Sequence, residues 1–120
     1  VGVITADSKS LDEALLEAAG VKSGERLVIR GMEERENFSK AVIEETGVLD
    51  SDKVKREAVS VASEMVEKEQ KIRALLLECS CLPPYASAIQ KAVELPVFDY
   101  VTMINYVHST LVRDSFEGQI

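Results

Sequence analysis

The residue best suited to chemistry is Cys79, in the sequence Glu78-Cys79-Ser80-Cys81 after a short apolar run. The prolines Pro83-Pro84 then open a helical pattern, whose first turn presents free N–H groups and the positive end of the helix dipole. We expect that helix to favour a thiolate at Cys79, which could act as a base, a nucleophile or, once protonated, an acid. The alternative is a buried, inert thiol, because free cysteine is among the most buried residue types.

Cys81 does not turn this position into a metal or redox centre. Cys-x-Cys with one distant histidine, His108, lacks the ligand spacing of a zinc site, and redox pairs usually read Cys-x-x-Cys. On an extended segment Cys79 and Cys81 point to the same side, about 6.6 Å apart along the chain. Cys81 therefore cannot be a second base on the opposite face of a carbanion. No nucleotide-binding or zinc-hydrolase motif is present, so we expect neither metal nor cofactor.

Four short apolar runs would position these residues. Their apolar character is continuous rather than alternating, which is typical of parallel strands buried on both faces. Polar residues follow each run, and in an open parallel sheet ligands bind beyond the carboxyl ends of the strands. The pattern predicts an α/β fold, a four-stranded parallel sheet sandwiched by helices, with the flavodoxin-like strand order 2-1-3-4. The runs are Val1–Thr5, Arg26–Arg30, Ile72–Leu77 and Val97–Tyr100.

The helices alternate with these runs. Ser10-x-x-Glu13 predicts a capping box at the start of the first helix, and Gly20 is expected to end it. Further helices are expected over roughly residues 38–45, after Ser51, after Pro83 and from about Thr102. The inner face of the helix after Ser51 is expected to carry Val54, Ala58, Val61, Ala62, Met65 and Val66. The last helix is expected to have a spine of Met103, Val107 and Leu111, with His108 as a structural histidine.

Composition excludes several classes of protein. The 120 residues are 46% hydrophobic and 29% charged, which is typical of a globular domain. A net charge of −7 leaves no basic stripe for nucleic acid, and no apolar run approaches a membrane span. Two cysteines in one Cys-x-Cys pair favour a cytoplasmic location. Because a strand pattern begins at Val1 itself, we expect residues 1–120 to be a single α/β domain, the C-terminal half of a longer two-domain protein.

The segment around Cys79 also resembles a family signature. Ala74-Leu-Leu-Leu-Glu78-Cys79-Ser80-Cys81-Leu82-Pro83-Pro84-Tyr85-Ala86 is similar to the strand–cysteine–threonine–helix motif in the second half of aspartate/glutamate racemases. It is closest to the branch with Glu-Cys-Thr-x-x-Pro-Pro-Tyr. Three other segments fit the family in order, so the resemblance covers nearly the whole chain. They are Val1-Gly-Val-Ile-Thr-Ala-Asp7, Arg30-Gly-Met-Glu33 with Phe38, and Leu95-Pro-Val-Phe-Asp-Tyr-Val-Thr102.

The resemblance implies an activity and a site. In this family two similar domains face each other across the substrate, each with one cysteine, and move a proton at the α-carbon without a cofactor. On this chain it implies Cys79 as the catalytic cysteine. It also implies that Thr5, Ser80 and Thr102, with nearby backbone N–H groups, bind the carboxylate of a small carboxylate or amino-acid-like substrate.

The expected function is therefore that of a racemase-like isomerase, with three alternatives left open. Arylmalonate decarboxylases and maleate isomerases belong to the same superfamily, and a non-catalytic ligand-binding or regulatory domain needs no reactive thiol. Cys81 stands where glutamate racemases often have histidine, which argues against glutamate as the substrate. The second cysteine would lie in an N-terminal domain, so we expect the isolated chain to be inactive without that partner. Assembly into a homo-oligomer is left open.

Overall fold

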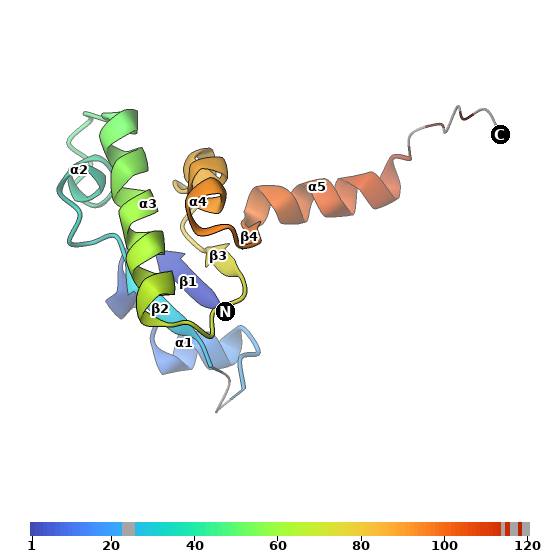
Figure 1. Ribbon diagram of the computed structural model, residues 1–120, viewed down its shortest axis with the longest axis horizontal. Helices are drawn as coiled ribbons and strands as arrows, with labels where there is room; N and C mark the ends of the chain where they lie inside the picture. The colour runs from blue at the N-terminus through green and yellow to red at the C-terminus, as the bar shows by residue number, and fades with distance from the viewer. Residues whose placement is uncertain (23–25, 114, 116–117, 119–120) are drawn as a thin grey trace.

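The protein is described by a computed structural model that covers residues 1–22, 26–113, 115 and 118. Its centre is a four-stranded sheet in which every pair of neighbouring strands is parallel (Figure 1). The strand order β2-β1-β3-β4 confirms the predicted fold and topology. β1 and β2 are one residue shorter than their apolar runs, and β3 and β4 are half as long as theirs. The bounds are β1 Gly2–Thr5, β2 Val28–Gly31, β3 Leu75–Leu77 and β4 Val97–Phe98.

The two faces of the sheet differ in how well they are covered. The register pairs Gly2 with Leu75 and Ile4 with Leu77, and these residues face the larger helices. A Cβ on Gly2 would lie 2.5 Å from the sulfur of Met65. The helix that carries Met65 therefore packs directly against β1. Ile4, Leu75 and Leu77 are at most 1% exposed. The main core therefore lies on this side of the sheet.

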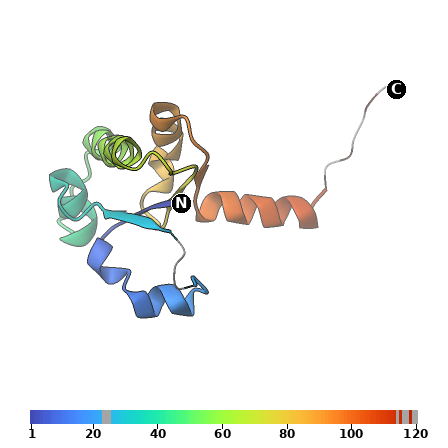
Figure 2. The same ribbon diagram turned by 60° about the horizontal axis from the view of Figure 1, so that its bottom comes forward.

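Helices lie on both faces (Figure 2). The helices α3 (Ser51–Lys68) and α4 (Ala86–Val93) cover one face, and the shorter α1 (Glu13–Ala18) lies on the other. Buried apolar residues recur along α3 at helical spacing, as its sequence predicted. Val28 lies in a run whose pattern predicted burial on both faces, but it is only partly buried because β2 is an edge strand. The buried residues of α3 are Val54, Ala58, Val61, Ala62 and Met65.

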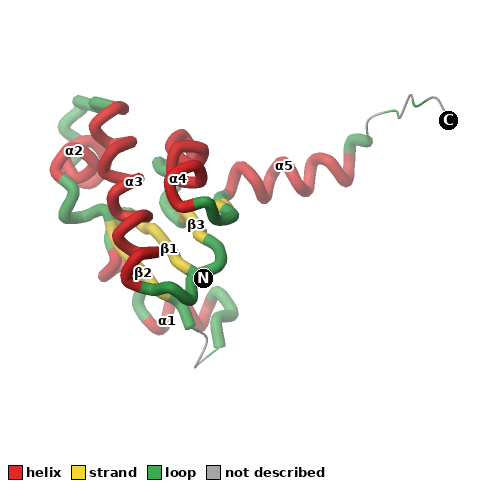
Figure 3. Tube along the Cα trace, in the orientation of Figure 1, coloured by secondary structure: helices red, strands yellow, loops and turns green. Residues whose placement is uncertain are grey.

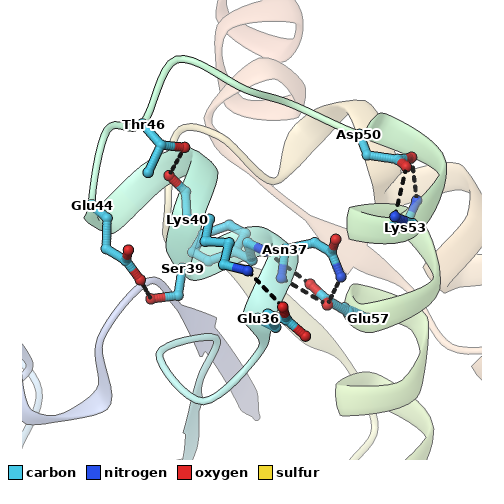
Figure 4. A network of polar contacts seen from close by, with 10 residues as sticks. Glu36, Asn37, Ser39, Lys40, Glu44, Thr46, Asp50, Lys53 and Glu57 are labelled. Carbon is cyan, nitrogen blue, oxygen red and sulfur yellow. Dashed lines mark hydrogen bonds and ion pairs between the residues drawn. The ribbon is translucent and has the colours of Figure 1, made fainter.

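The segment between β2 and α3 is held by one carboxylate. It contains the short helix α2 (Glu36–Phe38) and a π-helical turn, Ser39–Ile43. Glu57, on α3, accepts hydrogen bonds from the backbone and side-chain nitrogens of Asn37 and from the backbone of Phe38 (Figure 4). These bonds occupy N–H groups at the start of α2 that have no partner within the helix. Phe38 is thereby fixed in the core, with 0% exposure.

The start of α1 differs from the predicted capping box. Asp12 caps the helix, because its side chain accepts from the backbone N–H of Leu15 at 2.8 Å. Ser10 instead donates to Asp7 at 3.2 Å, within a separate 3-10 turn, Ser8–Ser10. The predicted end is confirmed, since Gly20 follows the helix with a φ of +85°, in the left-handed region.

The last helix, α5 (Tyr100–Leu111), projects away from the sheet (Figures 1 and 3). The three residues predicted as its apolar spine therefore do not pack against the sheet. Met103 is 62% exposed, Val107 50% and Leu111 78%. His108 is exposed as well, so it is not a buried structural histidine.

Candidate functional site

Thr5 and Glu78 meet at the carboxyl edge of the two central strands. Thr5 ends β1 and is 3% exposed, and its hydroxyl donates to a carboxylate oxygen of Glu78 at 2.7 Å. The backbone N–H of Glu78 donates to Ile4 at 2.9 Å, which extends the strand pairing by one step. Side chains alternate along a strand, so Glu78 lies on the same face as Leu76. Sequence reasoning missed Glu78, although this alternation was there to be read.

A second carboxylate lies at the end of β2. Glu33 accepts hydrogen bonds from the hydroxyl and the backbone N–H of Ser8. A Cβ on Gly31 would collide with the Glu33 carboxylate, so glycine at this position gives it room. Partial burial works against the charged form of Glu33, but the bonds from Ser8 outweigh it and lower the pKa of this carboxyl. The carboxyl edge of the sheet is therefore acidic.

Cys79 follows Glu78 and is half-buried against the core. Its sulfur accepts a hydrogen bond from the backbone N–H of Cys81 at 3.4 Å. Burial raises the pKa of the Cys79 thiol, with the neighbouring Cys81 thiol and Glu78 carboxylate acting in the same direction. The expectation that the next helix lowers the pKa of Cys79 is therefore wrong. A 3-10 turn, Pro83–Tyr85, stands between this cysteine and α4, and burial dominates.

The other predicted carboxylate ligands lie in three different settings. Ser80 is exposed in the turn after Cys79. Thr102 is on the first turn of α5, where its hydroxyl donates to the backbone oxygen of Asp99 at 2.7 Å. Thr5 likewise gives its hydroxyl proton to Glu78. Of these three hydroxyl groups, only that of Ser80 donates to no described residue. The carboxylate-binding role of all three residues stays a prediction.

A hollow of about 540 Å³ lies between the end of β3, β4 and the first turns of α5. Glu78 and Thr102 both line it. Three aromatic rings, those of Phe98, Tyr100 and Tyr106, form much of the remaining wall. No lysine, arginine or histidine belongs to the described lining. The hollow is thus aromatic and apolar, with negative charge at one end.

In the part of the chain that the structure describes, no three His, Cys, Asp or Glu side chains gather closely enough to hold a metal ion. None of the helices in residues 1–22 and 26–113 has the length and apolar character to cross a membrane.

Several curated proteins are similar to this chain. Dimethylsulfoniopropionate lyase 5 of Emiliania huxleyi (strain CCMP1516) is 36% identical over 113 residues, which is 89% of this chain and 22% of that protein. Dimethylsulfoniopropionate lyase 6 of the same strain is 33% identical over 120 residues, 93% of this chain and 31% of that protein. A dimethylsulfoniopropionate lyase of Durusdinium sp. clade D is 28% identical over 110 residues, 88% of this chain and 36% of that protein.

The chain therefore spans between 22% and 36% of the length of these relatives. No family model matches the chain. No solved structure matches it either.

These relatives correct the function expected from the sequence. The expected aspartate/glutamate racemase-like isomerase was wrong, since the similar proteins are named as lyases. The decarboxylase, maleate isomerase and non-catalytic alternatives do not match these names either. The compound in the names is dimethylsulfoniopropionate, not an amino acid. The expected N-terminal partner domain and homo-oligomer find no support in the comparisons.

Proposed function

We propose that this chain is the cysteine-bearing part of a dimethylsulfoniopropionate lyase. The observation that carries the proposal is the 36% and 33% identity with two lyases over 89% and 93% of the chain. A span of that length includes the position of Cys79. Because the chain covers 22% to 36% of those relatives, the activity of the whole protein is part of the same proposal.

The substrate name defines the chemistry of the reaction. Dimethylsulfoniopropionate carries a dimethylsulfonium group on carbon 3 of propionate, and a lyase cleaves by elimination. The Cys79 thiolate removes a proton from carbon 2, next to the carboxylate. The electron pair of that C–H bond forms the double bond between carbons 2 and 3. The bond from carbon 3 to sulfur breaks with its electrons on sulfur, which gives acrylate and dimethyl sulfide, and the proton on Cys79 passes to water.

The surroundings of Cys79 suit a base more than a nucleophile. Half-burial raises its pKa, so a smaller fraction is thiolate at neutral pH. Each thiolate is correspondingly more basic, which helps it remove a proton from a weakly acidic carbon. The exposed Ser80 hydroxyl, next in sequence, is proposed to donate to the substrate carboxylate. Thr5 and Thr102 are proposed to line the same site.

The assay is release of dimethyl sulfide, measured by headspace gas chromatography, with acrylate followed by NMR. Two proteins are tested: the chain itself, and dimethylsulfoniopropionate lyase 5 with its matching segment replaced by this chain. Cys79→Ser should reduce release by about 100-fold or more in the active protein. Cys81→Ser is the matched control and should retain activity. Release by neither protein, or equal release by Cys79→Ser, would contradict the proposal.

A cytoplasmic location is part of this proposal. Its support is that Cys79 and Cys81 are both free thiols, which is the usual state of cysteines in a reducing compartment.

A further inference from the structure

Three of the residues that line the hollow beside α5 are exposed aromatic residues. Phe98 is 53% exposed, Tyr100 44% and Tyr106 73%. Exposure of such large apolar rings to water is unfavourable. Such rings carry negative charge on their faces and attract cations placed over them. Phe98 comes from β4, and Tyr100 and Tyr106 come from two successive turns of α5, so the lining rings belong to two different elements. The arrangement can contact a small group from several sides.

Two carboxylates line the hollow, those of Glu78, which is exposed, and of Asp99, which is buried. Thr5 holds one oxygen of Glu78 at 2.7 Å, and no described residue donates to the other oxygen. Since no described lining residue is basic, the negative charge of Glu78 is not neutralised within the hollow. An aromatic wall beside an unpaired carboxylate is complementary to a cation whose surface is apolar. A methylated sulfonium or quaternary ammonium group has that chemistry, whereas a hydrated metal ion does not.

The start of α5 could oppose such a ligand, because a helix N-terminus is its positive end. Asp99 removes this difficulty. It is 6% exposed, and its carboxylate accepts from the backbone N–H of Thr102 at 2.8 Å. The fixed negative charge of Asp99 therefore lies against the positive end of the helix, on the wall of the hollow.

We propose that this hollow binds a methylated organic cation, with Glu78 as the counter-ion and Phe98, Tyr100 and Tyr106 as the surrounding rings. The identity of the cation rests on the proposed function: it is the dimethylsulfonium group of the substrate. Glu78 and Cys79 are adjacent, and their Cα atoms are therefore about 3.8 Å apart. Their side chains leave the chain on opposite faces, since Cys79 packs against the core and does not line the hollow. A substrate whose cation is held at Glu78 would therefore reach the thiol across the carboxyl edge of β3.

The binding test compares a methylated cation with a neutral molecule of similar size. Tetramethylammonium is the cation, and tert-butanol is a neutral molecule of similar size and shape. NMR titration of the chain should show saturable shifts of the Tyr100 and Tyr106 ring resonances with tetramethylammonium and weaker ones with tert-butanol. The same comparison is made with dimethylsulfoniopropionate and 4-methylpentanoate, in which a neutral CH replaces the sulfonium.

Two substitutions locate the site. Tyr106→Leu should weaken tetramethylammonium binding by about twofold to fivefold, the range of one exposed cation–π contact. Glu78→Gln, which keeps an acceptor for Thr5, should weaken it by about twofold to fivefold as one partly solvated charge is lost. Glu44→Gln, an exposed carboxylate on the far side of α3, is the matched control and should bind normally. Tyr106 is so exposed that its replacement should not unfold the chain, which circular dichroism checks.

The outcomes separate this inference from the proposed function. Cys79→Ser should keep tetramethylammonium binding while it abolishes elimination. Cation binding without any lyase activity would leave the site intact and refute the function. Absence of saturable shifts with tetramethylammonium, equal shifts with tert-butanol, or normal binding by both Glu78→Gln and Tyr106→Leu would each overturn the site.

Discussion

Glu57→Gln tests whether one carboxylate holds the segment between β2 and α3. Its Oε1 accepts from the backbone and side-chain nitrogens of Asn37 at 3.0 and 2.6 Å, and its Oε2 accepts from the backbone of Phe38 at 2.9 Å (Figure 4). Glutamine keeps one acceptor oxygen but sets an NH₂ group against one of these donors. At least one hydrogen bond to a charged group is lost, and such a bond contributes about 1.5–3 kcal/mol. Because Glu57 is only partly buried, we expect a loss near the lower end, about 2 kcal/mol.

The free energy of unfolding is measured by urea denaturation at pH 7. With a slope of about 1–1.5 kcal/mol per M for a chain of this size, the midpoint of unfolding should fall by about 1.3–2 M. Glu67→Gln, on the exposed end of the same helix, is the control and should change stability by less than about 0.5 kcal/mol. A similar, small effect of both substitutions would refute the assigned role of Glu57.

The pH dependence gives a second check on Glu57. Partial burial opposes its charged form, but the hydrogen bonds from Asn37 and Phe38 outweigh burial and lower its pKa. A lowered folded pKa adds stability that is present above the unfolded value of about 4.3 and is lost as pH falls through the folded value. The difference between wild type and Glu57→Gln should therefore shrink below about pH 4. A constant difference down to pH 2.5 would exclude the carboxylate charge as its cause.

Three further predictions follow from particular contacts. Because burial raises the pKa of Cys79, its alkylation by iodoacetamide and the proposed elimination should both accelerate as pH rises from 7 to 9; a plateau by pH 7 would contradict this. Gly2→Ala should destabilise the chain by about 1–3 kcal/mol in urea denaturation, since its new Cβ would lie 2.5 Å from the Met65 sulfur. Asp99→Ala removes the bond to the Thr102 N–H and should lower helix content in circular dichroism at a cost of about 1 kcal/mol, whereas a silent change would show that α5 does not need this cap.

The fold could be predicted because its signals are redundant. Four apolar runs, their order and the right-handed crossover rule all lead to one parallel sheet. The inner face of α3 followed from spacing alone, and its buried residues match that pattern. The capping box at Ser10 could not be settled in the same way, since Asp7, Asp12 and Ser10 are all good caps within six residues. Only the backbone path decides which of them meets a free N–H.

The last helix shows a different limit of the sequence. Its apolar spine correctly indicated a helix, but periodicity does not say which surface a helix will cover. Tyr100 was expected to end a strand, yet Asp99 and Thr102 exchange hydrogen bonds that begin α5 directly after β4. That reciprocal cap fixes the residue at which α5 begins.

The site was predicted less completely than the fold, because burial and a nearby helix change the pKa of a cysteine in opposite directions. Cys79 was placed correctly at the carboxyl edge of β3, but the direction of its pKa was wrong. Pro83-Pro84 indicated a helix that would lower the pKa of Cys79. The burial that raises this pKa depends on packing between residues far apart in the sequence. Glu78 was overlooked because a charged residue at a strand end usually only marks the exit from the core. Its bond to Thr5, 73 residues away in sequence, belongs to the tertiary fold.

Glu78 links the two proposals through its charge. The Glu78 carboxylate is one of the groups that raise the pKa of Cys79, so in the unliganded protein it suppresses the thiolate that elimination requires. A cation bound against Glu78 would offset that charge, and the thiolate would become more accessible only when a cationic substrate is present. 4-Methylpentanoate, which has the same shape but no sulfonium charge, would not offset the charge of Glu78 and would not favour the thiolate. Glu78→Gln should therefore make Cys79 alkylate faster in the free protein while it raises the KM for dimethylsulfoniopropionate. A variant with slower alkylation and an unchanged KM would break this link, because both effects follow from the same charge.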